Sequence, residues 1–124
     1  MAEKKEEAIS ERLRNPLGMF DVAGQTAIIT GASGAFGRGI SLTLGALGAN
    51  LVLASGSEKE LEKVANEVAE VGGKAETIVC RPDSLEDAKS ICDLALSEFG
   101  SIKMLAIGSG YNKAGFIHEM DYDD

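Results

Sequence analysis

The sequence is poor in the residues that build disulfide scaffolds, metal centres and catalytic pairs. Its 124 residues contain two cysteines, Cys80 and Cys92, and one histidine, His118. The cysteines lack the spacing of a metal-binding or redox motif, so two partly buried thiols are favoured over a disulfide. A single histidine without a catalytic partner is typical of a surface residue. We therefore predict neither a metal site nor a nucleophile–base pair.

Basic residues and long apolar runs are also scarce. Twelve Lys and Arg residues against 20 Asp and Glu residues give a net charge of −8, which argues against nucleic-acid or anionic-membrane partners. No apolar run reaches the ~18 residues of a membrane span, and the charged first residues lack the apolar core of a secretion signal. We therefore expect a cytoplasmic protein. Acidic residues near residue 124 are interpreted as a solvated helix start rather than a divalent-ion site: Glu119, Asp121, Asp123 and Asp124.

Glycine, by contrast, is abundant, and the chain divides into an arm and a domain. There are 15 glycines, and 44% apolar with 26% charged residues is ordinary for a globular protein. Residues 1–20 are predicted to be a charged N-terminal arm, since residues 1–15 are mostly Glu, Lys, Arg and Ala and Pro16 breaks any helix. The arm is a solubilising tail or a segment that packs on a neighbouring subunit. The domain is predicted over residues 21–124.

Four short apolar runs recur along the domain at nearly even spacing, over residues 26–30, 50–54, 77–80 and 102–107. Amphipathic stretches with helical spacing lie between them. This alternation predicts an α/β fold with a doubly wound, Rossmann-type parallel sheet. The right-handed crossover rule gives the strand order 3-2-1-4, with the sheet truncated after the fourth strand. Without a fifth strand beside it, the fourth strand is expected to be an apolar edge, so the chain alone should be marginal or associate.

Capping residues bound two of the predicted helices. Ser57 with Glu60 forms a capping-box pattern, and Gly72–Gly73 ends the same helix. Ser84 with Asp87 starts the next helix, and Gly100 ends it.

The segment Thr30-Gly-Ala-Ser-Gly-Ala-Phe-Gly-Arg-Gly39 directly follows the first apolar run and opens an amphipathic stretch. Glycine allows a tight turn and leaves room where a pyrophosphate approaches. A helix N-terminus then offers free N–H groups and a partial positive charge to the anion. The place of this turn between the first strand and the first helix is typical of a dinucleotide site. The alternative is a glycine turn that only lets helix and strand pack closely.

This turn resembles the TGxxxGxG pattern of the short-chain dehydrogenase/reductase family. Thr30, Gly31 and Gly37 match the pattern, and Ala35 stands where the middle glycine is usual. The resemblance runs over about residues 20–124. It implies the NAD(P)-binding part of an oxidoreductase that transfers a hydride between a nicotinamide cofactor and an alcohol or carbonyl substrate. The alternative is a non-catalytic nucleotide-binding or interaction module of the same type.

The resemblance also implies that the loops after the four strands line the cofactor. Ser55 ends the second strand, where an acid would bind the ribose of NAD and repel the phosphate of NADP. The cofactor is therefore NADP or NAD, with a slight preference for NADP. Lys59 is the nearby cation that could contact the NADP phosphate. After the third strand, Arg81 stacks on adenine, or the loop is merely solvated. Residues 107–110 replace the family's Asn-Asn-Ala-Gly. The predicted cofactor-binding residues are Gly31, Ser33, Ala35, Phe36, Gly37, Ser55, Gly56, Arg81, Asp83, Gly108, Ser109 and Gly110.

The family's proton donor is a tyrosine with a lysine four residues later, which lowers the tyrosine pKa. The tyrosines here, Tyr111 and Tyr122, have no such lysine within the 124 residues, since residue 115 is glycine. We therefore assign no catalytic residue and expect the chain alone to be inactive. An alcohol or carbonyl substrate and homo-oligomerisation would belong to a longer protein.

Overall fold

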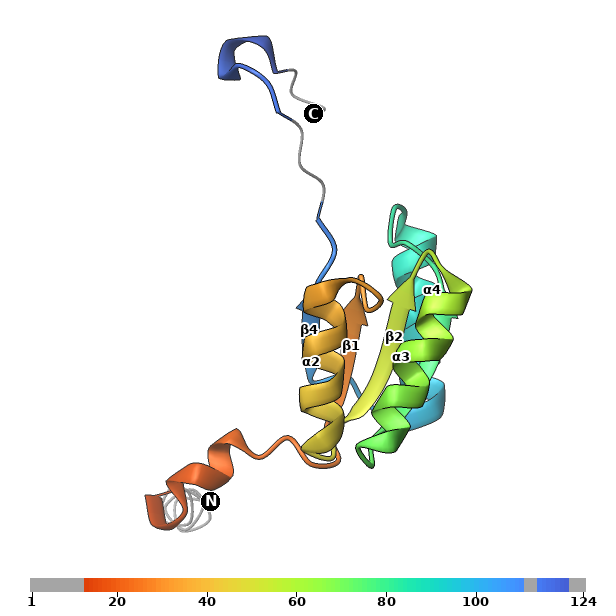
Figure 1. The fold of residues 1–124 in the computed structure, drawn as a ribbon. Helices are drawn as coiled ribbons and strands as arrows, with labels where there is room; N and C mark the ends of the chain where they lie inside the picture. The colour runs from red at the N-terminus through yellow and green to blue at the C-terminus, as the bar shows by residue number, and fades with distance from the viewer. Residues whose placement is uncertain (1–12, 111–113, 121–124) are drawn as a thin grey trace.

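The computed structural model describes residues 13–110 and 114–120. Four parallel strands form one sheet in the order β3-β2-β1-β4, with helices on both faces (Figure 1), which confirms the predicted fold. In chain order the elements are η1 (Pro16–Phe20), β1 (Thr26–Thr30), α2 (Ala35–Ala46), β2 (Asn50–Ser55), α3 (Glu58–Glu70), β3 (Lys74–Val79), α4 (Leu85–Phe99), β4 (Met104–Ile107) and η2 (Ile117–Glu119).

The central strands β1 and β2 are buried on both faces, as their continuous apolar runs predict. Helices α2 and α3 cover one face, where Ile29 and Leu51 pack against Val68. Helix α4 covers the other face and buries Ile28 against Ile91 (Figure 1). Each such buried side chain contributes about 1.5–3 kcal/mol of transfer free energy. The two cores hold the carboxyl ends of the strands in a fixed arrangement.

Strand β3 begins earlier than its apolar run predicts, at Lys74 rather than Thr77. It is an edge strand paired only with β2 in the described sheet. Lys74 and Glu76 are exposed there, while Ala75 and Ile78 are half-buried. Because exposed polar residues alternate with apolar ones here, the start of the strand does not form a continuous apolar run.

The helix ends agree with the predicted caps except at one residue. The Asp87 N–H donates to Ser84 Oγ over 3.1 Å at the start of α4, and Gly100 ends the helix with φ of 76°. Gly72 follows α3 with φ of 84°. Ser57 stands at the N-cap of α3, but its side chain makes no capping hydrogen bond, so the predicted capping box is wrong.

The outer strand β4 exposes apolar side chains on the face that α4 covers elsewhere. Leu105 and Ile107 lie beside Ile28 and Thr30 of β1 and are 62% and 71% exposed. A cavity of about 320 Å³, with lining that includes both side chains and Ile91, runs between this strand and α4. The expected apolar edge is therefore present in the structure.

The segments outside the sheet carry few contacts with it. Residues 13–20 are all exposed, and η1 stands away from the sheet (Figure 1); the remainder of the predicted arm lies outside the described residues.

Within residues 13–110 and 114–120, no helix has the length and apolar character needed to cross a membrane. Cys80 and Cys92 are half-buried free thiols.

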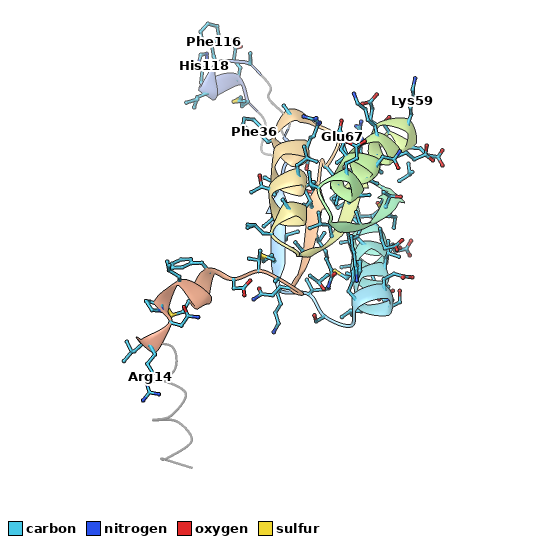
Figure 2. All side chains as sticks on the ribbon, turned by 60° about the horizontal axis from the view of Figure 1, so that its bottom comes forward. Arg14, Phe36, Lys59, Glu67, Phe116 and His118 are labelled. Carbon is cyan, nitrogen blue, oxygen red and sulfur yellow. The ribbon has the colours of Figure 1, made fainter. Side chains whose placement is uncertain are left out.

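An ion pair joins α2 to α3 across the surface. Arg38 Nε donates to Glu67 Oε2 over 2.6 Å (Glu67 is labelled in Figure 2). This hydrogen bond, more than the charge of Arg38 alone, lowers the pKa of Glu67. Because the folded pKa lies below the unfolded one, the pair stabilises the fold above the unfolded value and loses this effect as the pH falls through the folded value.

We expect Arg38→Met to raise the pKa of Glu67 toward its ordinary value, because the donor of its hydrogen bond is lost. The difference in free energy of unfolding between the wild type and Arg38→Met should then shrink as the solution is acidified below the ordinary glutamate pKa of about 4.3. Urea unfolding over a pH series and NMR titration of the Glu67 carboxyl carbon measure the two effects. The Lys89→Met variant, which removes the exposed pair with Asp93, leaves the Glu67 titration unchanged. A Glu67 midpoint unmoved by Arg38→Met contradicts the prediction.

Candidate cofactor site

The loops after all four strands meet around one cavity of about 640 Å³ at the carboxyl edge of the sheet. This is the edge where open α/β sheets bind ligands. The cavity is lined by every predicted cofactor-binding residue except Ala35, Phe36 and Gly37. Gly34, Cys80 and Pro82 also line it, and sequence reasoning missed them. All three residues lie in loops that the sequence already assigned to the site, and this position could have identified them.

Three glycines bring the first turn and the β4 loop into backbone contact. Gly31 has φ of 61°, and a Cβ there would lie 2.5 Å from the Ser109 backbone nitrogen. A Cβ on Gly37 would lie 2.1 Å from the Gly31 carbonyl oxygen, and one on Gly108 would lie 3.0 Å from Gly37 Cα. Gly37 is therefore a packing residue behind the cavity wall. Gly37 lets the helix and the turn pack closely and does not line the cavity, whereas Gly31 and Gly34 do line it.

The two residues before Gly37 face elsewhere. Ala35 and Phe36 line a separate hollow of about 430 Å³ along α2, with Ile40 and Thr43 among its neighbours. The Phe36 ring is 81% exposed at the start of the helix (Figure 2). Ala35 is also exposed, so its methyl group in place of the usual glycine hydrogen meets open surface. The structure does not bring these two side chains into the cavity.

Three serines, Ser33, Ser55 and Ser109, place hydroxyl groups in the cavity lining. Ser33, in the turn after β1, hydrogen-bonds Ser55 at the end of β2 with 2.5 Å between the hydroxyl oxygens. Ser109 Oγ lies 3.3 Å from Thr30 Oγ1 on the other side of the turn. Serine hydroxyls both donate and accept hydrogen bonds, so the end of β2 offers a neutral contact where a carboxylate would repel a phosphate.

Arg81 supplies a positive charge to this lining. Its guanidinium lies against Gly56, with Nε 2.5 Å from the place where a Cβ on that glycine would stand. Asp83, in the same loop, is the acid of the cavity lining. Lys59 does not line the cavity, and its side chain projects outward from the start of α3 (Figure 2). Among the described residues, the cation that lines the cavity is therefore Arg81, and Lys59 is not part of the lining.

The described residues that line the cavity include no nucleophile–base pair. Burial raises the pKa of the Cys80 thiol, and the nearby carboxylates of Asp87 and Asp83 act in the same direction. The thiol therefore stays protonated at neutral pH. His118 stacks on Phe116 with 5.7 Å between the ring centres, away from the cavity (Figure 2). No group of three or more metal-ligating side chains occurs in residues 13–110 and 114–120; Tyr111, Tyr122 and three acids of the predicted tail lie outside the described residues.

A family model described as short chain dehydrogenase matches residues 25–124. The chain belongs to the short-chain dehydrogenase/reductase family. It is 34% identical over 97% of its length to an uncharacterized oxidoreductase of Mycobacterium tuberculosis, of which it covers 44%. It is 32% identical to the hydroxynaphthalene reductase-like protein Arp2 of Metarhizium anisopliae, over 82% of this chain and 40% of that protein. The chain therefore spans less than half the length of these relatives.

Solved structures of this family share the fold. A short-chain type dehydrogenase/reductase from Mycobacterium marinum superposes with a TM-score of 0.76 at 31% identity, over 86% of this chain and 43% of that one. A metagenomic short-chain oxidoreductase in complex with NADP gives a TM-score of 0.70 at 30% identity, over 83% of this chain and 47% of that one. A putative D-mannonate oxidoreductase from Haemophilus influenza with bound NAD gives 0.69 at 29% identity, over 75% and 33%.

Proposed function

We propose that this chain holds a nicotinamide dinucleotide, NADP in preference to NAD, in the cavity at the carboxyl edge of its sheet. In a longer protein, the bound cofactor would exchange a hydride with an alcohol or carbonyl substrate. The observation that carries the proposal is that loops from all four strands line one cavity beside the glycine turn. Similar family members that are solved with NADP or NAD support the choice of ligand.

The residues around the cavity fit such a cofactor. Helix α2 starts beside the cavity with Gly34 at its N-cap, and no side-chain hydrogen bond and no acid occupy its first turn. Its free N–H groups and partial positive charge would hold the pyrophosphate. Ser55 and Gly56 would face the adenosine ribose. The small residues of the β4 loop, Gly108 to Gly110, would let the nicotinamide half pass close to the backbone.

The cofactor would supply the hydride chemistry, and the described residues would bind and orient it. The described residues that line the cavity include no histidine, lysine or tyrosine, the Cys80 thiol is held protonated, and the one carboxyl group is that of Asp83. We therefore propose that the 124-residue chain binds dinucleotide without turning substrate over. The proton donor of the longer protein would come from residues outside the described part.

Calorimetric titration with NADP⁺ and NAD⁺ tests this proposal, with adenosine as the ligand that lacks a pyrophosphate. We expect both dinucleotides to bind and adenosine to bind at least tenfold more weakly, because adenosine lacks the pyrophosphate that the N-terminus of α2 would hold. Gly110→Glu should weaken dinucleotide binding at least about tenfold, since it adds a carboxylate at the cavity wall. A Cβ on Gly110 meets nothing within 4 Å, so the fold tolerates the change.

Gly39→Glu is the matched control, because it adds the same charge at a position that is also open but lies on α2 outside the cavity. We expect it to leave binding within about twofold. Equal weakening by the two variants would mean that the added charge acts from a distance and not at the cavity. No binding of either dinucleotide to the folded chain would overturn the proposal.

A non-catalytic module is the second candidate, favoured by the sequence of the β4 loop. Residues 107–110 read Ile-Gly-Ser-Gly, so the side-chain amides of the family pattern are replaced by one hydroxyl. The oxidoreductase and a nucleotide-binding module both predict dinucleotide binding, whereas a module that serves only protein interaction does not. The first two separate when a longer protein with this chain at its start is assayed for NADPH oxidation with a panel of aldehydes and ketones. Turnover of any of them selects the oxidoreductase, and binding without turnover selects the module.

A further inference from the structure

The loop after β3 delivers an arginine to the end of β2. A Cβ on Gly56 would lie 2.5 Å from Arg81 Nε and 3.2 Å from both Cζ and Nη2. The three nearest atoms to that point all belong to the Arg81 side chain. The guanidinium therefore occupies the space that a side chain at position 56 would fill. Glycine at 56 leaves this space open, and an arginine from the loop after β3 fills it.

The neighbours of this guanidinium suit a phosphate more than a sugar hydroxyl alone. Ser55 is only 8% exposed, and its hydroxyl pairs with that of Ser33 on the cavity wall. The Ser57 N–H also points to Ser55 Oγ, over 3.4 Å. Arg81 forms no ion pair within residues 13–110 and 114–120, although Asp83 lies in its own loop. This guanidinium lines the same cavity as the two hydroxyls and offers charge-assisted donors to an anion there.

We infer that Arg81 is the residue that selects the 2′-phosphate of NADP, with Ser33 and Ser55 as the hydroxyls that complete the phosphate site. This inference rests on the proposed binding of a nicotinamide dinucleotide in the same cavity. It differs from stacking of Arg81 on adenine, because stacking would serve NAD and NADP alike. A planar guanidinium with several donors matches a phosphate monoester, whereas a ribose hydroxyl uses at most one of them.

The packing of Arg81 against Gly56 suggests a second substitution that should restore the NADP preference lost in Arg81→Ala. Because the three atoms nearest to the Cβ position of Gly56 all belong to Arg81, Arg81→Ala removes the closest contacts that a side chain at residue 56 would meet. Gly56 is not among the glycines with positive φ, so a side chain there is unstrained. The double variant Arg81→Ala/Gly56→Arg thus returns a guanidinium to the same cavity, from the residue after β2 instead of the loop after β3.

Calorimetry with NADP⁺ and NAD⁺ on the 124-residue chain and its variants tests the inference. We expect the wild type to prefer NADP⁺ and Arg81→Ala to reduce this preference at least about tenfold, the usual effect of a charge-assisted hydrogen bond. The Kd for NAD⁺ should change less than about twofold. The double variant should recover most of the preference. Lys59→Ala, which removes an equal charge outside the cavity, should leave the preference unchanged.

The outcomes separate this inference from the proposed function. If both dinucleotides bind and Arg81→Ala leaves their ratio of Kd values unchanged, the selector role is wrong and the cavity remains a dinucleotide site. If Arg81→Ala weakens both ligands equally, Arg81 stacks on adenine and does not select phosphate. If neither ligand binds the folded wild type, the proposed function fails and the inference fails with it. Circular dichroism of Arg81→Ala and Arg81→Lys checks that both variants fold, and Arg81→Lys should keep part of the preference.

Discussion

Gly37→Ala is expected to abolish dinucleotide binding and to lower the free energy of unfolding by about 2–3 kcal/mol, the upper range for overpacking. A Cβ at this position would stand 2.1 Å from the Gly31 carbonyl oxygen and 2.7 Å from Ala32 Cα. Both are backbone atoms of the first turn, so no side-chain rotation relieves the clash. The turn must then move away from α2, and the cavity wall that it forms together with the β4 loop moves with it.

Gly39→Ala provides the matched control in the same helix. A Cβ on Gly39 meets nothing within 4 Å, and the residue is exposed. Because alanine forms helices better than glycine, this variant should gain about 1 kcal/mol of stability and bind dinucleotide normally. Urea unfolding and calorimetry measure both effects. Gly37→Ala with wild-type stability would show that the turn does not pack on α2 as described.

The double variant Leu105→Gln/Ile107→Gln is expected to weaken self-association of the chain at least about tenfold, since burial of each of these side chains supplies about 1.5–3 kcal/mol. The two side chains form an apolar stripe on the outer strand of the sheet and are 62% and 71% exposed. An edge strand with such a surface readily pairs with other chains. Their contacts within the chain are limited by that exposure, so the fold should tolerate glutamine at both positions.

Sedimentation velocity over a concentration series measures this association. Leu85→Gln/Leu96→Gln is the control, because it removes two exposed leucines of α4, 86% and 50% exposed, without touching β4. We expect this control to leave the association within about threefold of the wild type, since scattered apolar side chains are ordinary on protein surfaces. A wild type that stays monomeric at all concentrations would contradict the prediction, and so would an equal loss in the control.

The sequence predicts the buried parts of this fold better than its exposed parts. Strand β1 occupies the residues expected from its apolar run, because both of its faces are covered and the run is uninterrupted. The start of β3 was missed because an edge strand with a solvated face carries Lys74 and Glu76 within its length. Ser84 caps α4 as its pattern predicts, whereas Ser57 occupies the cap position of α3 without the hydrogen bond. In these two helices the capping pattern predicts the first helical residue, but it predicts the capping hydrogen bond in only one of them.

The candidate site shows a similar division. The glycine turn and the strand ends placed the cavity, because the carboxyl ends of parallel strands share one edge. The separation of Ala35 and Phe36 from the cavity follows from the direction in which α2 leaves the turn, which a linear pattern does not contain. The place of Arg81 beside Gly56 depends on the course of the loop between β3 and α4, which brings this side chain to the end of the neighbouring strand β2. Cofactor binding by these residues stays a prediction until it is measured.

The contact between Thr30 and Ser109 joins residues 79 positions apart, and this separation determines when the site can form during synthesis. Synthesis runs from the N-terminus, so β1, β2 and β3 leave the ribosome before β4 is available. The cavity acquires its last wall only when β4 docks beside β1. A bound dinucleotide would stabilise only the state with this strand in place. Amide hydrogens of β4 should therefore gain the most protection from exchange when ligand is added, while those of β2 change little.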